Sequence, residues 1–399
     1  MDMAASFGGL PEELKLAIIS FLDVDPKQAD KASFLKTSNT TGHAPLKHLS
    51  LVSKKWNVLT KSCLLARLVV RISPSKESAS DNSSSATRFR TALRNAPVEI
   101  ETFITQHEVP NRLHSLTICI HESFAEVGVA LRNPAQHSID IISMNRFWRR
   151  LFDHLDPTRL SIVAPVSILG WLTTVELHLD DAWVFPAMAV QTLELQQDRS
   201  SAQAAQPTSS ASTSPRDAAW DTEFLFRVRP WTQLRLREGS MLNAYGGYEY
   251  FHKQAPTILR AVATPRSATL TSFSHQVLFP FNTHVGAQHL VSLSYYRHIH
   301  FEYAPRPDDN SLSDPNVVGN QIDLGDCWRE IEQIYKRAVA VEPLSPLFRQ
   351  GGCVESFSSG DYGIASIREI LDQAFLVHAR NGWKGDGQGK WVRRNHEKT

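Results

Sequence analysis

The chain contains little cysteine, and its cysteines are not grouped. Its 399 residues include only four, Cys63, Cys119, Cys327 and Cys353, with no Cys-x-x-Cys pair. This spacing argues against a zinc knuckle or a disulfide framework and favours a reducing compartment, so we expect the cytoplasm, the nucleus or both. The sequence also lacks any apolar run of about 18 residues, the minimum for a membrane span, so we expect no contact with a membrane.

Net charge is nearly absent as well. The sequence has 42 basic and 41 acidic residues, a formal net charge of +1. This balance argues against nucleic acid as a main partner. The first residues, MDMAASFGG, have no basic segment followed by an apolar run, so we expect no secretory signal. Hydrophobic residues make up 42% of the chain, which is enough for a sizeable buried core.

Polar, low-complexity segments divide the chain. They are rich in serine, threonine, alanine or glycine and bury too little apolar surface to offset the entropy of ordering. We interpret them as an inserted loop (23–45), a serine-rich linker (73–87), a disordered insert (198–219) and a flexible tail (381–399). A small N-terminal domain over 8–72 and a larger domain over 88–380 remain.

The larger domain alternates helical and strand-like patterns. Apolar residues at helical spacing predict helices over 144–155, from Gly325 and from Gly363. Short alternating runs predict strands that begin near Leu113, Arg159, Leu172, Val190, Trp231, Leu270 and Leu290. This alternation indicates an α/β fold.

Several of the predicted strands share one pattern, apolar-x-x-apolar-x-apolar. It is found at Leu172-x-x-Val175-x-Leu177, Val190-x-x-Leu193-x-Leu195, Trp231-x-x-Leu234-x-Leu236, Leu290-x-x-Leu293-x-Tyr295 and Leu113-x-x-Leu116-x-Ile118, with a weaker copy at Leu270. When the low-complexity insert 198–219 is left out of the count, the first residues of successive copies are separated by multiples of about 20 residues. The pattern therefore resembles a leucine-rich repeat. The resemblance implies an irregular solenoid of short strands and helices that binds another protein. An ordinary α/β domain with evenly spaced strands is the alternative.

The N-terminal stretch LPEELKLAIISFL is typical of an amphipathic helix. Pro11 suits the first turn, where its missing N–H would have no partner. Glu12 and Glu13 favour the positive end of the helix dipole. An apolar stripe recurs at four-residue steps, at Leu10, Leu14, Ile18 and Leu22.

A second N-terminal stretch, LKHLSLVSKKWNVLTKSCLLARLVVRI, spans Leu46 to Ile72. Taken together, Leu10-Pro11-x-x-Leu14 and Leu49-x-Leu51-Val52-Ser53-Lys54-Lys55-Trp56 resemble the two halves of an F-box. The family usually joins these halves by a short loop, whereas here residues 23–45 lie between them. An ordinary helical subdomain that caps the larger domain is the alternative.

The resemblance implies a three-helix module that docks on the Skp adaptor of a cullin–RING ubiquitin ligase. The chain would be the substrate-recognition subunit, would bind an unidentified target protein through its larger domain, and would perform no catalysis itself. The adaptor-binding residues that it implies are Leu10, Pro11, Leu14, Ile18, Leu22, Leu51, Val52 and Trp56. For Trp56, packing inside the module is an equal alternative.

Two other functions remain open. The chain is either a scaffold that binds the Skp adaptor without a cullin or, less favoured, an α/β enzyme within 113–357. The histidines His298 and His300, with His284, His289 or Glu302, offer a metal-ligand set, but histidines on the polar side of a strand explain the pattern more simply. We therefore predict no metal, no cofactor and no catalytic residues.

Overall fold

The computed structural model describes most of both predicted domains. The described residues are 11–22, 45–73, 85–107, 113–124, 134–175, 177–198, 221, 223–246, 253–305, 312, 322–339, 353–377 and 382–394. Leu10, nearly all of the predicted loop 23–45, most of the linker 73–87 and the body of the insert 198–219 lie outside the described residues.

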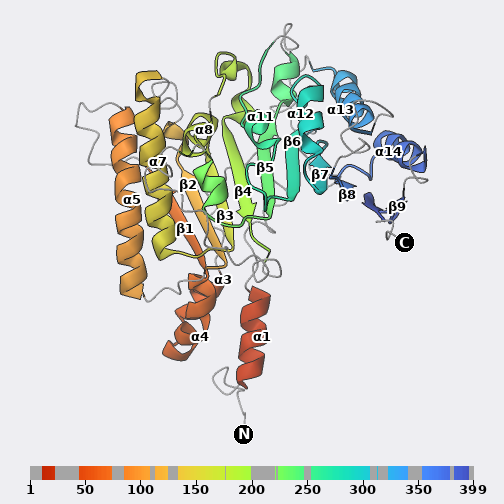
Figure 1. The fold of residues 1–399 in the computed structure, drawn as a ribbon. Coiled ribbons are helices and arrows are strands. Elements are labelled where there is room, and N and C mark those ends of the chain that lie inside the picture. Colours follow the sequence, from red (N-terminus) through yellow and green to blue (C-terminus); the bar gives the residue numbers. More distant parts are fainter. Residues whose placement is uncertain are drawn as a thin grey trace.

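The N-terminal part is helical. It consists of α1 (Glu12–Leu22), α3 (Pro45–Ser50) and α4 (Lys54–Leu65), which project from one end of the larger domain (Figure 1). Ile19 of α1 and Trp56 of α4 are buried together, and Leu49 and Leu59 pack against them. This core is too small to enclose every apolar side chain of three short helices.

The larger domain is built on one ten-stranded sheet whose strand order nearly follows the chain, β1-β2-β3-β4-β5-β6-β7-β8-β10-β9. The strands are β1 (Arg67–Ile72), β2 (Ser115–Ile120), β3 (Arg159–Pro165), β4 (Val190–Gln196), β5 (Gln233–Ser240), β6 (Ser272–Leu278), β7 (His298–Glu302), β8 (Ser356–Ser359), β9 (Trp383–Gly385) and β10 (Lys390–Arg393). Neighbouring strands are parallel, except that β4 and β10 run antiparallel to both of their neighbours. The predicted α/β class is confirmed in this coarser form.

The predicted solenoid is wrong. A repeat solenoid needs every unit to make the same turn and return in the same direction. Here β4 reverses direction between β3 and β5, and the chain ends in the β9–β10 hairpin. The strands therefore belong to a single mixed sheet and not to a stack of equivalent repeats.

Helices cover one face of this sheet. The larger ones are α5 (Ser85–His107), α7 (Pro134–His154), α8 (Val166–Leu172), α12 (Ala287–Leu293), α13 (Leu324–Val339) and α14 (Ala365–Val377), with the short α10 (Phe224–Arg227) and α11 (Leu259–Val262). Short 3₁₀ turns lie at η4 (Glu122–Phe124), η5 (Ala182–Val184), η6 (Pro186–Met188) and η7 (Leu242–Gly246). Crossovers between parallel strands are nearly always right-handed, so a strand order that follows the chain brings successive helices to the same face.

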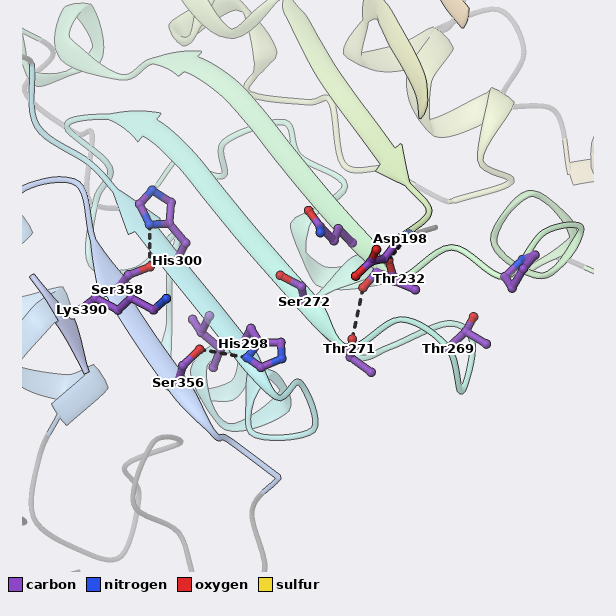
Figure 2. A pocket seen from close by; sticks show the side chains of 13 residues that line it. Asp198, Thr232, Thr269, Thr271, Ser272, His298, His300, Ser356, Ser358 and Lys390 are labelled. Carbon is purple, nitrogen blue, oxygen red and sulfur yellow. Dashed lines mark hydrogen bonds between the residues drawn. The ribbon is translucent and has the colours of Figure 1, made fainter. Parts of the chain in front are cut away.

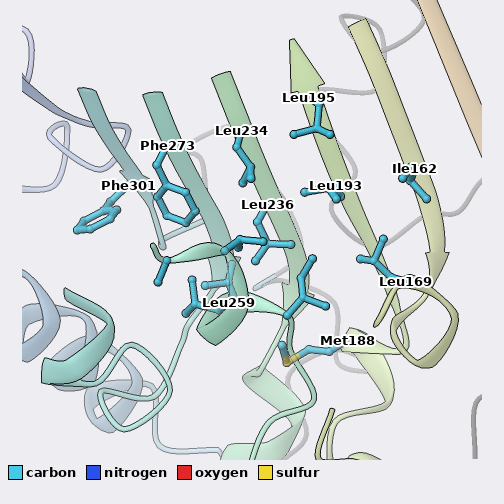
Figure 3. Close-up of a cluster of buried hydrophobic side chains, with 14 of the residues drawn as sticks. Ile162, Leu169, Met188, Leu193, Leu195, Leu234, Leu236, Leu259, Phe273 and Phe301 are labelled. Atoms are coloured by element: carbon cyan, nitrogen blue, oxygen red, sulfur yellow. The ribbon is translucent and has the colours of Figure 1, made fainter. Parts of the chain in front are cut away.

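The core lies between this face and the helices. Leu193, Leu195, Leu234, Leu236 and Phe273 point from their strands to the same side, where they meet residues of α8, η6 and α11 (Figure 3). Each is at most 1% exposed, and burying one such side chain stabilises the fold by about 1.5–3 kcal/mol. Among the described helices, none is long and apolar enough to cross a membrane.

Five segments differ from the sequence predictions. Residues 172–175, expected to begin a strand, lie at the end of α8 and in the turn that follows. The run predicted as a strand from Leu290 begins in α12, and only its later part forms the strand β7. Arg67–Ile72, expected to close the N-terminal module, is the edge strand β1. The expected flexible tail contains β9 and β10, and the expected linker 73–87 overlaps the first turn of α5.

Candidate functional site

The second face of the sheet carries polar side chains and no layer of described helices. Because side chains alternate along a strand, the residues that flank the buried leucines all point to this side. The strand register aligns them in rows across the sheet. We call this surface the open face; its central row is Val69, Thr117, Ser161, Glu194, Arg235, Ser274, His300 and Ser358.

Basic side chains outnumber acidic ones on the open face. Glu194 is paired with Arg159 at 2.8 Å and with Arg235 at 3.7 Å. Arg237 lies one row away, and its burial lowers the pKa of its guanidinium. Glu302 on β7 also interacts electrostatically with Arg237, so Glu194 and Glu302 together partly balance the guanidinium groups of this face.

A polar hollow of about 540 Å³ lies on the open face over β5 to β8 and β10. Figure 2 shows hydroxyl and imidazole groups along its wall: His298 Nδ1 lies 2.9 Å from Ser356 Oγ, and His300 Nδ1 lies 2.9 Å from Ser358 Oγ. Lys390 of β10 also lines it. Burial lowers the pKa of His298, so its imidazole is neutral near pH 7 and both donates and accepts hydrogen bonds.

This hollow does not form a nucleophilic triad. Ser358, His300 and Glu302 follow one another, but His300 Nε2 lies 3.9 Å from Glu302 Oε2, beyond hydrogen-bond distance. Glu302 instead accepts a hydrogen bond from the side-chain amide of Gln276. The three side chains are therefore not aligned as a Ser-His-Glu triad in this structure.

The predicted adaptor-binding residues separate into exposed and buried sets. Leu14 on α1 is 52% exposed, while Leu51 and Val52, in the turn between α3 and α4, are 75% and 67% exposed. Pro11 is also exposed and Ile18 is half-buried. Leu22 ends α1.

Trp56 is only 4% exposed and packs against Ile19 inside the module, which agrees with the internal alternative. Sequence reasoning missed Val58, which is 71% exposed on α4. Its position on α4, two residues after the buried Trp56, was the available signal, because residues two apart on a helix point in different directions.

The histidine set that the sequence analysis considered and set aside does not come together in one place. His298 and His300 point to the open face, whereas His284 lies beyond β6 and contacts Glu238 on the other side of the sheet. Neither Glu238 nor His275, its other partner, was among the residues considered from the sequence, because no local motif connects them. Compared with known protein families, curated proteins and solved structures, the chain has no match.

Proposed function

We propose that the chain is the substrate-recognition subunit of a Skp–cullin–F-box ubiquitin ligase. The N-terminal helices dock on the Skp adaptor, and the open face of the sheet binds the target protein. The chain supplies proximity rather than catalysis, because it holds a target near the ubiquitin-conjugating enzyme and so raises its effective concentration.

The observation that carries this proposal is the exposed apolar surface of the small helical module. Leu14, Leu51, Val52 and Val58 are all more than half exposed on a module whose own core contains little besides Ile19 and Trp56. Exposed apolar groups that are concentrated in one small module are typical of a protein–protein interaction site. Leu14, Leu51 and Val52 also belong to the stretches that resemble an F-box, and this resemblance is the reason for proposing the Skp adaptor as the partner.

The open face supports the second half of the proposal. Hydroxyl, imidazole and guanidinium groups form ordered rows there, and these groups are suited to a polar, acidic segment of a target protein. Charge complementarity of this kind raises association rates and selects partners.

Co-purification of the tagged chain with the Skp adaptor tests the proposal. We expect Leu51→Asp with Val52→Asp to weaken adaptor binding at least about tenfold, because two charges would be placed in an apolar contact. These side chains are largely exposed, so the fold should survive. Leu14→Asp with Ile18→Asp should have the same effect, although half-buried Ile18 makes it the less clean variant.

Leu376→Asp is the matched control, since Leu376 is 76% exposed on α14 at the opposite end of the chain. Unchanged adaptor binding in the Leu51/Val52 variant would contradict the proposal. Probing the same eluate for a cullin separates a ligase subunit from a scaffold that binds the adaptor alone.

A further inference from the structure

A charged group lies in the apolar core of the sheet. Glu238, near the end of β5, is fully buried on the face that the helices cover. His275 of β6 is also fully buried on this face, and His284, in the turn after β6, is 8% exposed. Buried carboxylates are rare in proteins unless they are paired or coordinate a metal.

The three side chains converge on one point. His275 Nε2 and His284 Nε2 each lie 2.7 Å from Glu238 Oε2. One ligand atom from each residue lies within 4.8 Å of the others, and they form the only such group of three among the described residues. Two imidazole nitrogens and a carboxylate oxygen are ligands that Zn²⁺ prefers.

Ordinary strand alternation brings Glu238 into this position, since Leu234, Leu236 and Glu238 all turn to the covered face, and a bulge follows directly. The register between β5 and β6 shifts between Arg237 and Ser240, and Gly239 there has φ of +85°. Bulges redirect side chains and are common beside functional sites. Glu238 is further fixed by a hydrogen bond that it accepts from the Thr257 hydroxyl.

One of the two imidazoles has a further partner that orients it. Tyr303 Oη lies 3.2 Å from His275 Nδ1, where it can accept a hydrogen bond from Nδ1–H once Nε2 binds a metal.

We propose that Glu238, His275 and His284 bind a divalent transition-metal ion, with Zn²⁺ the best match to the ligand set. A tetrahedral centre with bonds of about 2.0–2.1 Å separates its ligand atoms by roughly 3.3 Å, so the two ring nitrogens need to retreat from Glu238 by about half an ångström. His284 lies on a turn, which allows this movement more easily than a position within a strand does.

A cavity adjoins the cluster at His284. His284 and Thr257 line a polar cavity of about 840 Å³, whose wall also contains Lys253, Arg260 and Arg266. Three protein ligands with a fourth position open to solvent is the arrangement in which zinc keeps a bound water molecule. The basic wall favours an anion beside that water. This inference is independent of the proposed ligase role.

Metal analysis of the purified full-length chain tests the site. We expect close to one equivalent of Zn²⁺ per chain, a lower melting temperature after chelation, and recovery of that temperature when Zn²⁺ alone is returned. Co²⁺ in place of Zn²⁺ should give the intense visible absorption of a tetrahedral centre.

Glu238→Gln and His284→Asn should each lower metal occupancy at least about tenfold, the loss typical when a ligand or its support is removed. His300→Asn, a histidine on the open face of the same sheet, is the control and should keep full occupancy. A folded wild-type chain that holds less than about a tenth of an equivalent, with a melting temperature insensitive to added Zn²⁺, overturns the proposal and leaves a hydrogen-bonded cluster.

Discussion

Gly239 shows how a single residue shapes the sheet. Its φ of +85° belongs to the left-handed region that favours glycine. A Cβ built there would lie 2.3 Å from the carbonyl oxygen of Ala187, so no side chain fits without movement of the backbone. The bulge that follows Glu238 in β5 therefore depends on this glycine.

The cysteines give a residue-scale prediction. Cys327 is buried in α13, and burial raises its pKa to about 12, so only about one thiol in ten thousand is ionised at pH 8. Cys353 is exposed. We expect a maleimide reagent to label Cys353 in native buffer and Cys327 only after unfolding, as measured by peptide mass spectrometry. Equal labelling of the two in the native chain would show that α13 does not pack as described.

At the scale of elements, the C-terminal hairpin completes the aromatic core. Trp391 of β10 stacks on Phe375 of α14, with ring centroids 4.4 Å apart and planes 8° apart. Trp383 of β9 also packs against Phe375, at 5.3 Å. Stacked aromatic pairs add about 0.5–1.5 kcal/mol beyond the burial of their surface. The hairpin therefore stabilises the last strands of the sheet.

Trp391→Ala should lower the free energy of unfolding by about 3–5 kcal/mol, because it leaves a large cavity against Phe375 and Phe357. Val392→Ala, one residue further on, shortens a side chain that is 44% exposed. It should change the free energy of unfolding by less than about 0.5 kcal/mol. Urea denaturation measures both. Similar values for the two variants would show that β10 does not close the core.

Predictions of strands and helices from the sequence succeeded where the spacing of apolar residues is compatible with only one of the two. Alternation over 190–196 and 233–240 marks strands because only a strand turns every second side chain to the core. The pattern apolar-x-x-apolar at Leu290 and Leu293 fits a helix equally well, since residues three apart share a helix face. That ambiguity produced the false strands at 172 and 290.

The strands β9 and β10 were not predicted within residues 381–399 for a different reason. The glycines of this segment suggested disorder, yet Gly387 and Gly389 have positive φ in the turn between β9 and β10. The tryptophans on either side of that turn are buried. Glycine composition alone does not distinguish a hairpin turn from a flexible chain, whereas the flanking aromatics do.

At the scale of the whole molecule, the two faces of the sheet differ in chemistry. The apolar face forms the core and carries the Glu238 cluster, and the open face carries rows of polar side chains. The sequence predicted the exposed apolar residues of the N-terminal module through a local motif. It did not predict the Glu238 cluster, because Glu238 and His284 are 46 residues apart and meet only through strand register.

Hydrogen–deuterium exchange of the full-length chain, with and without purified Skp adaptor, tests the central claim most directly. We expect the adaptor to slow amide exchange in α1, in α3 and at residues 51–53, where Leu14, Leu51 and Val52 offer the apolar surface. Exchange in β2 to β8 should stay unchanged. No added protection in the N-terminal helices at saturating adaptor, or protection confined to the sheet, would contradict the account.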